Sequence, residues 1–205
     1  MHALRIGATP DTRDIRTRII DAVVSAAAAT GLRKLSMDEI ARSAGVGRAT
    51  LYKYFPGRDA LIAAAVDSEL AAFFAEVAAV RDRHDDQDDQ LIHGFAHAYR
   101  LLRHHPALQA VLRLNPTLLL PYLITDASPA LDFGRFFVES ATHLDETVPA
   151  ATRAQFAEQV ARAFHTLILI PTTTFDLDAP EGPENYARNF LLPVKDHLLK
   201  TAAEH

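Results

Sequence analysis

The sequence predicts an all-α protein. Apolar residues recur at helical spacing in almost every long segment, glycine and proline mark the boundaries between these segments, and we find no stretch of useful length with the two-residue period of a strand. The expected architecture is an N-terminal three-helix head, one long connecting helix, and a C-terminal bundle of about five further helices.

Composition narrows the class of protein. The chain has 205 residues and no cysteine, which excludes disulfides, thiolate metal sites and cysteine nucleophiles and is compatible with a reducing cytoplasm. It contains neither an apolar run long enough to span a bilayer nor an N-terminal segment of secretory type. We therefore expect a cytoplasmic protein without a membrane partner.

Charge is distributed unevenly along the chain. The formal net charge is −5, but residues 1–66 contain ten Lys and Arg against six Asp and Glu, which gives +4 and leaves −9 for the remainder. A basic module attached to an acidic body is suited to approach a polyanion with one end only.

The first helix is expected to begin at Asp11 or Thr12, after a mobile arm of residues 1–10, and to end at Gly31. Its buried face would consist of apolar residues at helical spacing, namely Ile15, Ile19, Ala22, Val23 and Ala26.

Ser36 and Glu39 form a capping box that predicts the start of a second helix, with Leu35 and Ile40 as the apolar pair flanking the cap. Gly45 can adopt the left-handed conformation that a tight corner requires. A third, short helix follows at about residues 47–54.

Two short helices joined by a glycine-containing turn are the helix-turn-helix arrangement, whose second helix can enter the major groove of DNA. Leu51 and Phe55 are predicted to pack inward with Val46 and Ile40. The outward residues make this surface basic, aromatic and hydroxyl-bearing, without a carboxylate. They are Arg48, Ala49, Thr50, Tyr52 and Lys53.

This part of the chain, about residues 13–62, resembles the DNA-binding signature of the TetR family of transcriptional regulators. The residues that carry the resemblance are Ser36, Ala41, Gly45, Val46, Thr50, Leu51, Tyr52, Tyr54, Phe55, Asp59 and Leu61. It implies a DNA-binding domain at residues 1–62 and a ligand-binding and dimerisation domain at residues 63–205. The DNA contacts we assign with it are Ser36, Arg48, Ala49, Thr50, Tyr52, Lys53, Tyr54 and Arg58, and the family also places phosphate contacts near Arg13, Arg16 and Arg18.

The function implied by the resemblance is that of a ligand-responsive repressor. Such a protein would bind a near-palindromic DNA operator as a homodimer and be released by a small, largely apolar effector. The alternatives are a helical protein-interaction module and a small-molecule-binding protein that does not bind DNA. We find no phosphate loop, dinucleotide fingerprint or nucleophile motif, and therefore expect neither an enzyme nor a cofactor.

The connecting helix is expected at about residues 58–83, with its N-terminal N–H groups and Arg58 near a DNA phosphate. Further helices are expected at about residues 90–104, 106–114, from 115 through Pro121, 129–145, 150–170 and 184–201. Leu167 to Ile170 is predicted to be buried on every side, and Pro193 to kink the last helix. We assign the dimer face to the helices at 150–170 and 184–201.

The effector pocket is predicted from apolar and aromatic residues that suit a drug-sized ligand. They are Phe95, Tyr99, Leu102, Leu119, Tyr122, Phe133, Phe137 and Phe164, with His165 and Thr166 as polar groups able to orient the ligand. An ordinary core would have the same pattern, and this alternative stays open.

His93 and His97 are four residues apart and could in principle ligate a metal. Arg100 lies on the same stripe, which favours a solvated face over a metal site.

Overall fold

The computed structural model describes residues 14–33, 35–118, 129–141, 148–170 and 174–203. The described residues are helical with no strand among them, which confirms the all-α class. The helices are α1 (Ile15–Thr30), α2 (Met37–Ser43), α3 (Arg48–Tyr54), α4 (Arg58–Arg81), α5 (Gln87–His104), α6 (Pro106–Leu114), α8 (Pro129–Ala141), α9 (Ala150–Leu169), α10 (Gly182–Tyr186) and α11 (Leu192–Ala203). A 3-10 turn (Pro116–Leu118) follows α6 and a π turn (Ala187–Leu191) precedes α11. None of the described helices is long and apolar enough to cross a bilayer.

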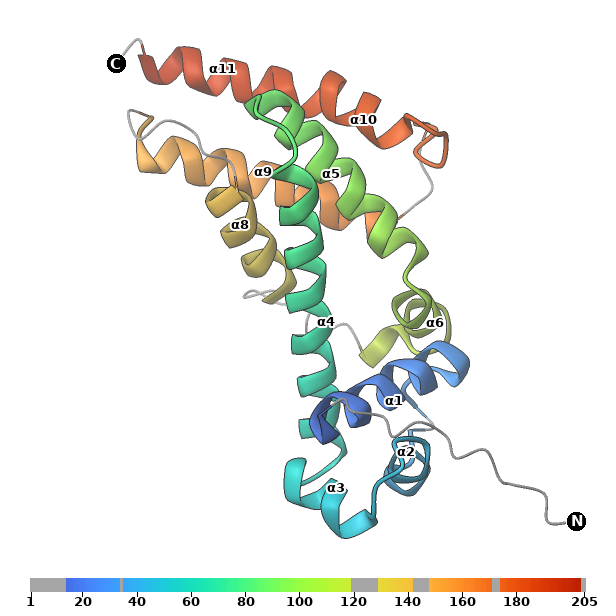
Figure 1. The fold of residues 1–205 in the computed structure, drawn as a ribbon. Coiled ribbons are helices and arrows are strands. Elements are labelled where there is room, and N and C mark those ends of the chain that lie inside the picture. The colour runs from blue at the N-terminus through green and yellow to red at the C-terminus, as the bar shows by residue number, and fades with distance from the viewer. Residues whose placement is uncertain (1–13, 34, 119–128, 142–147, 171–173, 204–205) are drawn as a thin grey trace, which may run out of the picture.

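The head is a three-helix unit packed around the first turns of α4 (Figure 1). Its core contains Ile19 from α1, Ile40 from α2, and Leu51 and Phe55 from α3 and its end, together with Leu61 from α4. The predicted inward packing of Leu51 and Phe55 is confirmed.

The local signals of the helix-turn-helix are also confirmed. The Ser36 hydroxyl oxygen accepts a hydrogen bond from the Glu39 N–H at 3.5 Å. Gly45 lies in the left-handed region at φ 64°, and the Val46 N–H donates to the Ala41 carbonyl at 2.9 Å.

Helix boundaries differ from the predictions where an aspartate caps a helix. Asp14 accepts from the Arg16 N–H at 3.2 Å, so α1 begins at Ile15 and not at Asp11 or Thr12. Asp86 accepts from the N–H groups of Asp88 and Asp89 at 2.8 and 3.1 Å, so α5 begins three residues earlier than predicted, at Gln87. An Asp side chain satisfies N–H groups that the first turn leaves unpaired.

Helix α4 connects the head to the body. Its 24 residues make a rod of about 36 Å, which runs between α5 and α8 in Figure 1. The body has a core of its own, to which α5, α9 and the C-terminal helices contribute Leu91, Tyr99, Phe156, Val160 and Leu191.

The C-terminal segment changes helix type along its length. A π turn separates α10 from α11, and within it the Leu192 N–H donates to the Ala187 carbonyl. Pro193 has no N–H to offer the preceding turn, and widening that turn is one way to accommodate a proline. The kink expected at Pro193 stays a prediction.

Burial of residues 167–170 is only partly as predicted. Leu167 and Ile168 are buried, but Ile170 follows the end of α9 and is 63% exposed. The segment predicted to be helical around Pro121 lies outside the described residues beyond Leu118.

A second contact, besides α4, joins the head to the body. Helix α6 packs on α1 through a small apolar cluster that includes Ala27, Leu32 and Val111. Just beyond α6, the side-chain oxygen of Asn115 accepts a hydrogen bond from the Arg33 N–H at 3.2 Å. Gly31 ends α1 at φ 71°, and a Cβ atom there would overlap the same Asn115 oxygen.

We predict that Gly31→Ala destabilises the chain more than Gly45→Ala. Both glycines have positive φ, and Gly31, at φ 71° and ψ −177°, lies in a region that almost only glycine adopts, so its substitution costs about 1–3 kcal/mol of backbone strain. Only Gly31→Ala also displaces Asn115, since nothing lies within 4 Å of a Cβ at Gly45. Urea unfolding of both variants measures the difference, and equal losses would contradict the role assigned to the Asn115 contact.

An ion pair fastens α10 to α5. The Arg100 guanidinium donates to both Glu184 carboxylate oxygens at 2.6 Å and to the Pro180 carbonyl at 2.5 Å. Burial raises the pKa of the Glu184 carboxyl, but the hydrogen bonds from Arg100 and the attraction of its charge outweigh burial and leave that pKa below 4.5. The stripe predicted to be a solvated face is thus occupied by contacts between helices, which include a 3.1 Å pair of His97 with Glu76.

We predict that Glu184→Gln lowers the free energy of unfolding by about 1 kcal/mol at neutral pH, because Arg100 loses its charged partner. The pKa of Glu184 is lowered in the folded state, so this stabilisation is present above about pH 4.5 and is lost as the pH falls through the folded pKa. Chemical unfolding of parent and variant from pH 7 to pH 3 should show converging stabilities, and a constant difference would contradict the assignment.

Candidate functional site

The outer face of α3 is exposed. Arg48, Ala49, Tyr52, Lys53 and Tyr54 are all exposed, and Thr50 is half-buried. The helix that carries them is held from below by Leu51, which is fully buried. The fold therefore presents the predicted outward set on one accessible surface.

Arg48 has partners within the head. Its Nη1 lies 3.1 Å from an Asp38 carboxylate oxygen of α2, and its guanidinium lies 5.6 Å from the centre of the Tyr52 ring. Both members of the ion pair are more than half exposed. Exposed pairs of this kind contribute little to stability, so Arg48 can exchange Asp38 for another acceptor at low cost.

Arg58 and Ser36 lie differently from the residues on α3. Arg58 donates from Nη2 to the Leu32 carbonyl at 2.5 Å in a half-buried position, and Ser36 is half-buried and caps α2. The first turn of α4 beside Arg58 has no side-chain cap. Its N–H groups have the orientation that anions prefer at helix ends.

Arg16 and Arg18 of α1 also contact the helix-turn-helix. The Arg16 guanidinium lies 5.7 Å from the centre of the Phe55 ring, and Arg18 Nη2 donates to the Gly45 carbonyl at 3.3 Å. These contacts join α1 to the turn at Gly45 and to Phe55 at the end of α3. Arg13 lies outside the described residues.

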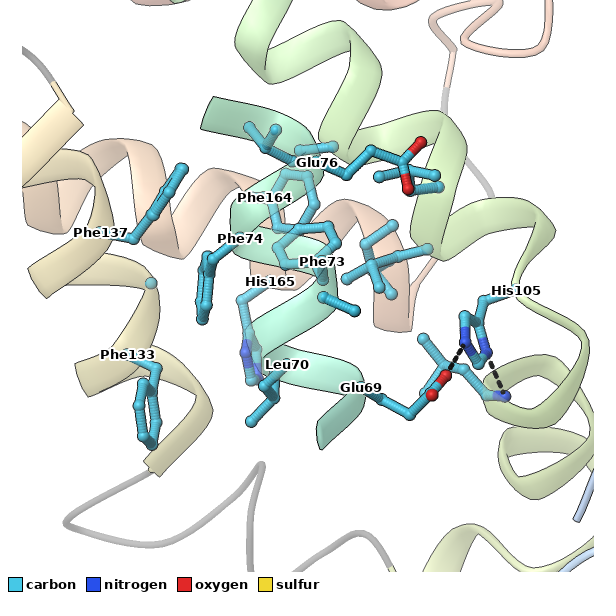
Figure 2. Close-up of a pocket in the computed structure, with 18 of the residues that line it drawn as sticks. Glu69, Leu70, Phe73, Phe74, Glu76, His105, Phe133, Phe137, Phe164 and His165 are labelled. Carbon is cyan, nitrogen blue, oxygen red and sulfur yellow. Dashed lines mark hydrogen bonds and ion pairs between the residues drawn. The ribbon is translucent and has the colours of Figure 1, made fainter. Parts of the chain in front are cut away.

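A cavity of about 550 Å³ lies in the body, within the range of small-molecule sites. Its wall is mostly apolar, and α1, α4, α5, α6, α8, α9 and α11 all contribute to it. Figure 2 shows phenylalanines from three helices that face this space. Phe74 of α4 stacks on Phe137 of α8 with ring centres 4.6 Å apart, and Phe73 lies 6.5 Å from Phe164 of α9.

Six of the residues predicted to bind the ligand do line this cavity: Phe95, Leu102, Phe133, Phe137, Phe164 and His165. Tyr99 does not line it. The Tyr99 side chain is buried in the body core, where burial and the nearby Asp178 carboxylate raise its pKa. Thr166 is exposed and also outside the wall, while Leu119 and Tyr122 lie outside the described residues.

Sequence reasoning missed the contribution of α4. This helix supplies Glu69, Leu70, Phe73, Phe74 and Glu76 to the wall. Apolar residues occur all round α4, so no single stripe distinguished a cavity face from a packing face. The adjacent pair Phe73 and Phe74 was the one feature of the α4 sequence that could have indicated a cavity.

In the cavity wall, hydrogen bonds of His105 link α4 to α6. His105 Nδ1 accepts from the Leu108 N–H at 3.1 Å and so caps α6, while its Nε2 lies 2.7 Å from a Glu69 carboxylate oxygen (Figure 2). Since Nδ1 accepts, the proton of the neutral ring is on Nε2 and is donated to Glu69. No cluster of metal-ligating side chains occurs among the residues described.

Comparison with known proteins identifies relatives of the head. A family model described as bacterial regulatory proteins of the tetR family matches residues 19–65. Over 93 residues the chain is 33% identical to an uncharacterised HTH-type transcriptional regulator of Mycobacterium tuberculosis, found in strains CDC 1551 / Oshkosh and H37Rv. That match covers 45% of this chain and 46% of the relative, so the chain spans about half the length of the curated relatives it matches.

Solved structures resemble the chain over almost its whole length. The TetR family repressor AlkX from Dietzia sp., implicated in biodegradation of n-alkanes, superposes with a TM-score of 0.64 at 22% identity, covering 95% of this chain and 98% of that one. FadR from Bacillus subtilis in complex with stearoyl-CoA gives 0.52 at 16% identity, covering 87% and 96%. At these identities the likeness establishes the fold.

Proposed function

This chain is a member of the TetR family of bacterial regulatory proteins, and from that premise we propose that it is a ligand-responsive repressor of transcription. Members of this family are DNA-binding regulators and not enzymes. The observation that carries the proposal is the exposed, carboxylate-free face of α3 on a head of net charge +4. A protein that reads chromosomal DNA acts in the cytoplasm.

We assign DNA binding to residues 1–62, and ligand binding and dimerisation to residues 63–205. In the proposed complex α3 enters the major groove, where Arg48 and Thr50 contact base edges and Tyr52 and Lys53 hold phosphates. Arg48 gives up its exposed pair with Asp38 to do so. The uncapped first turn of α4 holds a further phosphate, with Arg58 fixing the turn to Leu32.

Dimerisation follows from a near-palindromic operator, which requires two heads related by a two-fold axis. We propose that α9 and the α10–α11 segment form the dimer face. Exposed apolar side chains on these elements support the choice, since Ile170 is 63% and Phe190 42% exposed. Light scattering at micromolar concentration should give twice the mass of the 22.5 kDa chain, and a monomer would contradict this assignment.

The effector site is proposed to be the 550 Å³ cavity. Helix α6 forms one wall of the cavity and packs on α1 of the head, while α4 forms another wall and enters the head core. A ligand that fits the cavity best when these helices are displaced shifts the population toward heads with the wrong spacing for the operator. FadR from Bacillus subtilis, which shares the fold, was solved with stearoyl-CoA, and this supports a largely apolar effector.

A gel shift with the DNA that flanks the protein's own gene tests the function. We expect a specific complex that weakens steeply as salt rises, and a footprint with two-fold symmetry. Failure to bind any flanking fragment at low salt would favour the alternative of a small-molecule-binding protein that does not act on DNA, for which the cavity alone would suffice.

We predict different effects for two substitutions on α3. Lys53→Ala should weaken binding about evenly across sequences and reduce the slope of log affinity against log salt by about one, because one phosphate contact is lost. Arg48→Ala should blur the preference between operator variants, because base-edge contacts carry the discrimination. Titration of a panel of operator variants at several salt concentrations measures both effects.

Arg83→Ala is the matched control, because this exposed cation follows the end of α4 that is distant from the head and lies outside the proposed dimer face. Its affinity and salt slope should equal those of the parent. If Lys53→Ala also has the slope of the parent, Lys53 does not contact a phosphate.

A further inference from the structure

The chemical class of the effector follows from the charges in the cavity wall, on the premise that the cavity is the proposed effector site. Glu69 and Glu76 are seven residues apart and therefore share one side of α4. Both line the cavity, and Figure 2 shows their carboxylates beyond the group of phenylalanine rings. Asp67 adds a third carboxylate to the wall.

The Glu69 side chain has one neutral hydrogen-bond partner in the wall. Its partner His105 accepts a backbone N–H at Nδ1, so the ring is neutral and donates one hydrogen bond from Nε2. One neutral donor leaves most of the acceptor capacity of a carboxylate unused. The side chain of Glu69 is 38% exposed, which leaves room for a second donor.

Two permanent cations line the cavity, and each already has a carboxylate. Arg81 donates to Asp82 from Nε and Nη2 at 2.8 and 2.6 Å. Lys195, which is buried, donates to Asp88. Among the described residues, each cation of the wall is therefore already balanced in part by a carboxylate.

We propose that the effector is an amphiphilic organic cation, an apolar chain or ring system that carries an ammonium group. The apolar part lies among Phe73, Phe74, Phe137 and Phe164, and the ammonium group lies against Glu69. The carboxylate attracts the ammonium group, and burial of the apolar part among the rings removes its surface from water. The same wall repels a carboxylate or phosphate headgroup.

Calorimetric titration of the full chain with three probes of equal chain length tests the proposal. The probes are decylammonium, decanol and decanoate, with the two ions below the concentrations at which they form micelles and decanol below its solubility limit. We expect the cation to bind at least tenfold more tightly than the alcohol, and decanoate to bind most weakly. A tightest affinity for decanoate, equal affinities for cation and alcohol, or no binding of any probe would overturn the proposal.

Glu69→Gln is the decisive variant, because glutamine keeps the shape of the side chain and an oxygen that accepts from His105. It should reduce the preference for the cation over the alcohol by about tenfold while the affinity for decanol stays unchanged. Asp196→Asn, at an exposed carboxylate outside the wall, is the matched control and should keep the full preference. An unchanged preference in both Glu69→Gln and Glu76→Gln would show that these carboxylates do not select the ligand.

Circular dichroism and thermal unfolding check that each variant is folded. Operator binding without any probe is measured separately, by the gel shift. If the operator is bound but the cation is not preferred, the proposed ligand class fails and the regulator function stands. If the cation is preferred but no flanking DNA is bound, the ligand class stands and the regulator function fails.

Discussion

Helix α4 belongs both to the core of the head and to the wall of the cavity, and this sharing constrains the rest of the structure. Near its start Leu61 and Ala65 complete the core of the head, and further along Phe73 and Val77 line the cavity of the body. A continuous hydrogen-bonded helix transmits a tilt along its length, because its interior offers no proline at which to bend. In the proposed mechanism, a ligand that moves the wall at Phe73 would therefore act on the base of α3.

Helix α4 is one of two described links between head and body, because α6 also packs on α1. Asn115 links the end of α6 to the backbone at Arg33, and His105 links its start to Glu69 of α4. Both α4 and α6 line the cavity, and His105 joins them to each other. In the proposed mechanism, a ligand in the cavity would act on the head through these two helices.

Sequence patterns predicted the head well, because its signals are local. Ser36, Gly45 and Leu51 act within a few residues of themselves, through a cap, a positive φ and an inward-facing position. The body depends on partners far apart in sequence, such as Arg100 and Glu184, which are 84 residues apart. The spacing of Tyr99 on α5 predicted a place in the cavity wall, but its side chain lies near Asp178 instead. Sequence periodicity does not reveal such a contact. The wall formed by α4 was missed because a helix that is apolar all round gives no preferred direction.

The π turn before α11 determines which residues of the C-terminal segment face the interior. Pro183, Ala187, Leu191 and Lys195 follow one another at intervals of four and are all buried. In an uninterrupted α-helix such a row would drift by about 40° at each step and leave the interface within three steps. The wider turn underwinds the segment and cancels part of that drift. The extra residue of the π turn therefore keeps the ammonium group of Lys195 buried beside Asp88. Deleting one residue from this turn would rotate that charge toward the solvent.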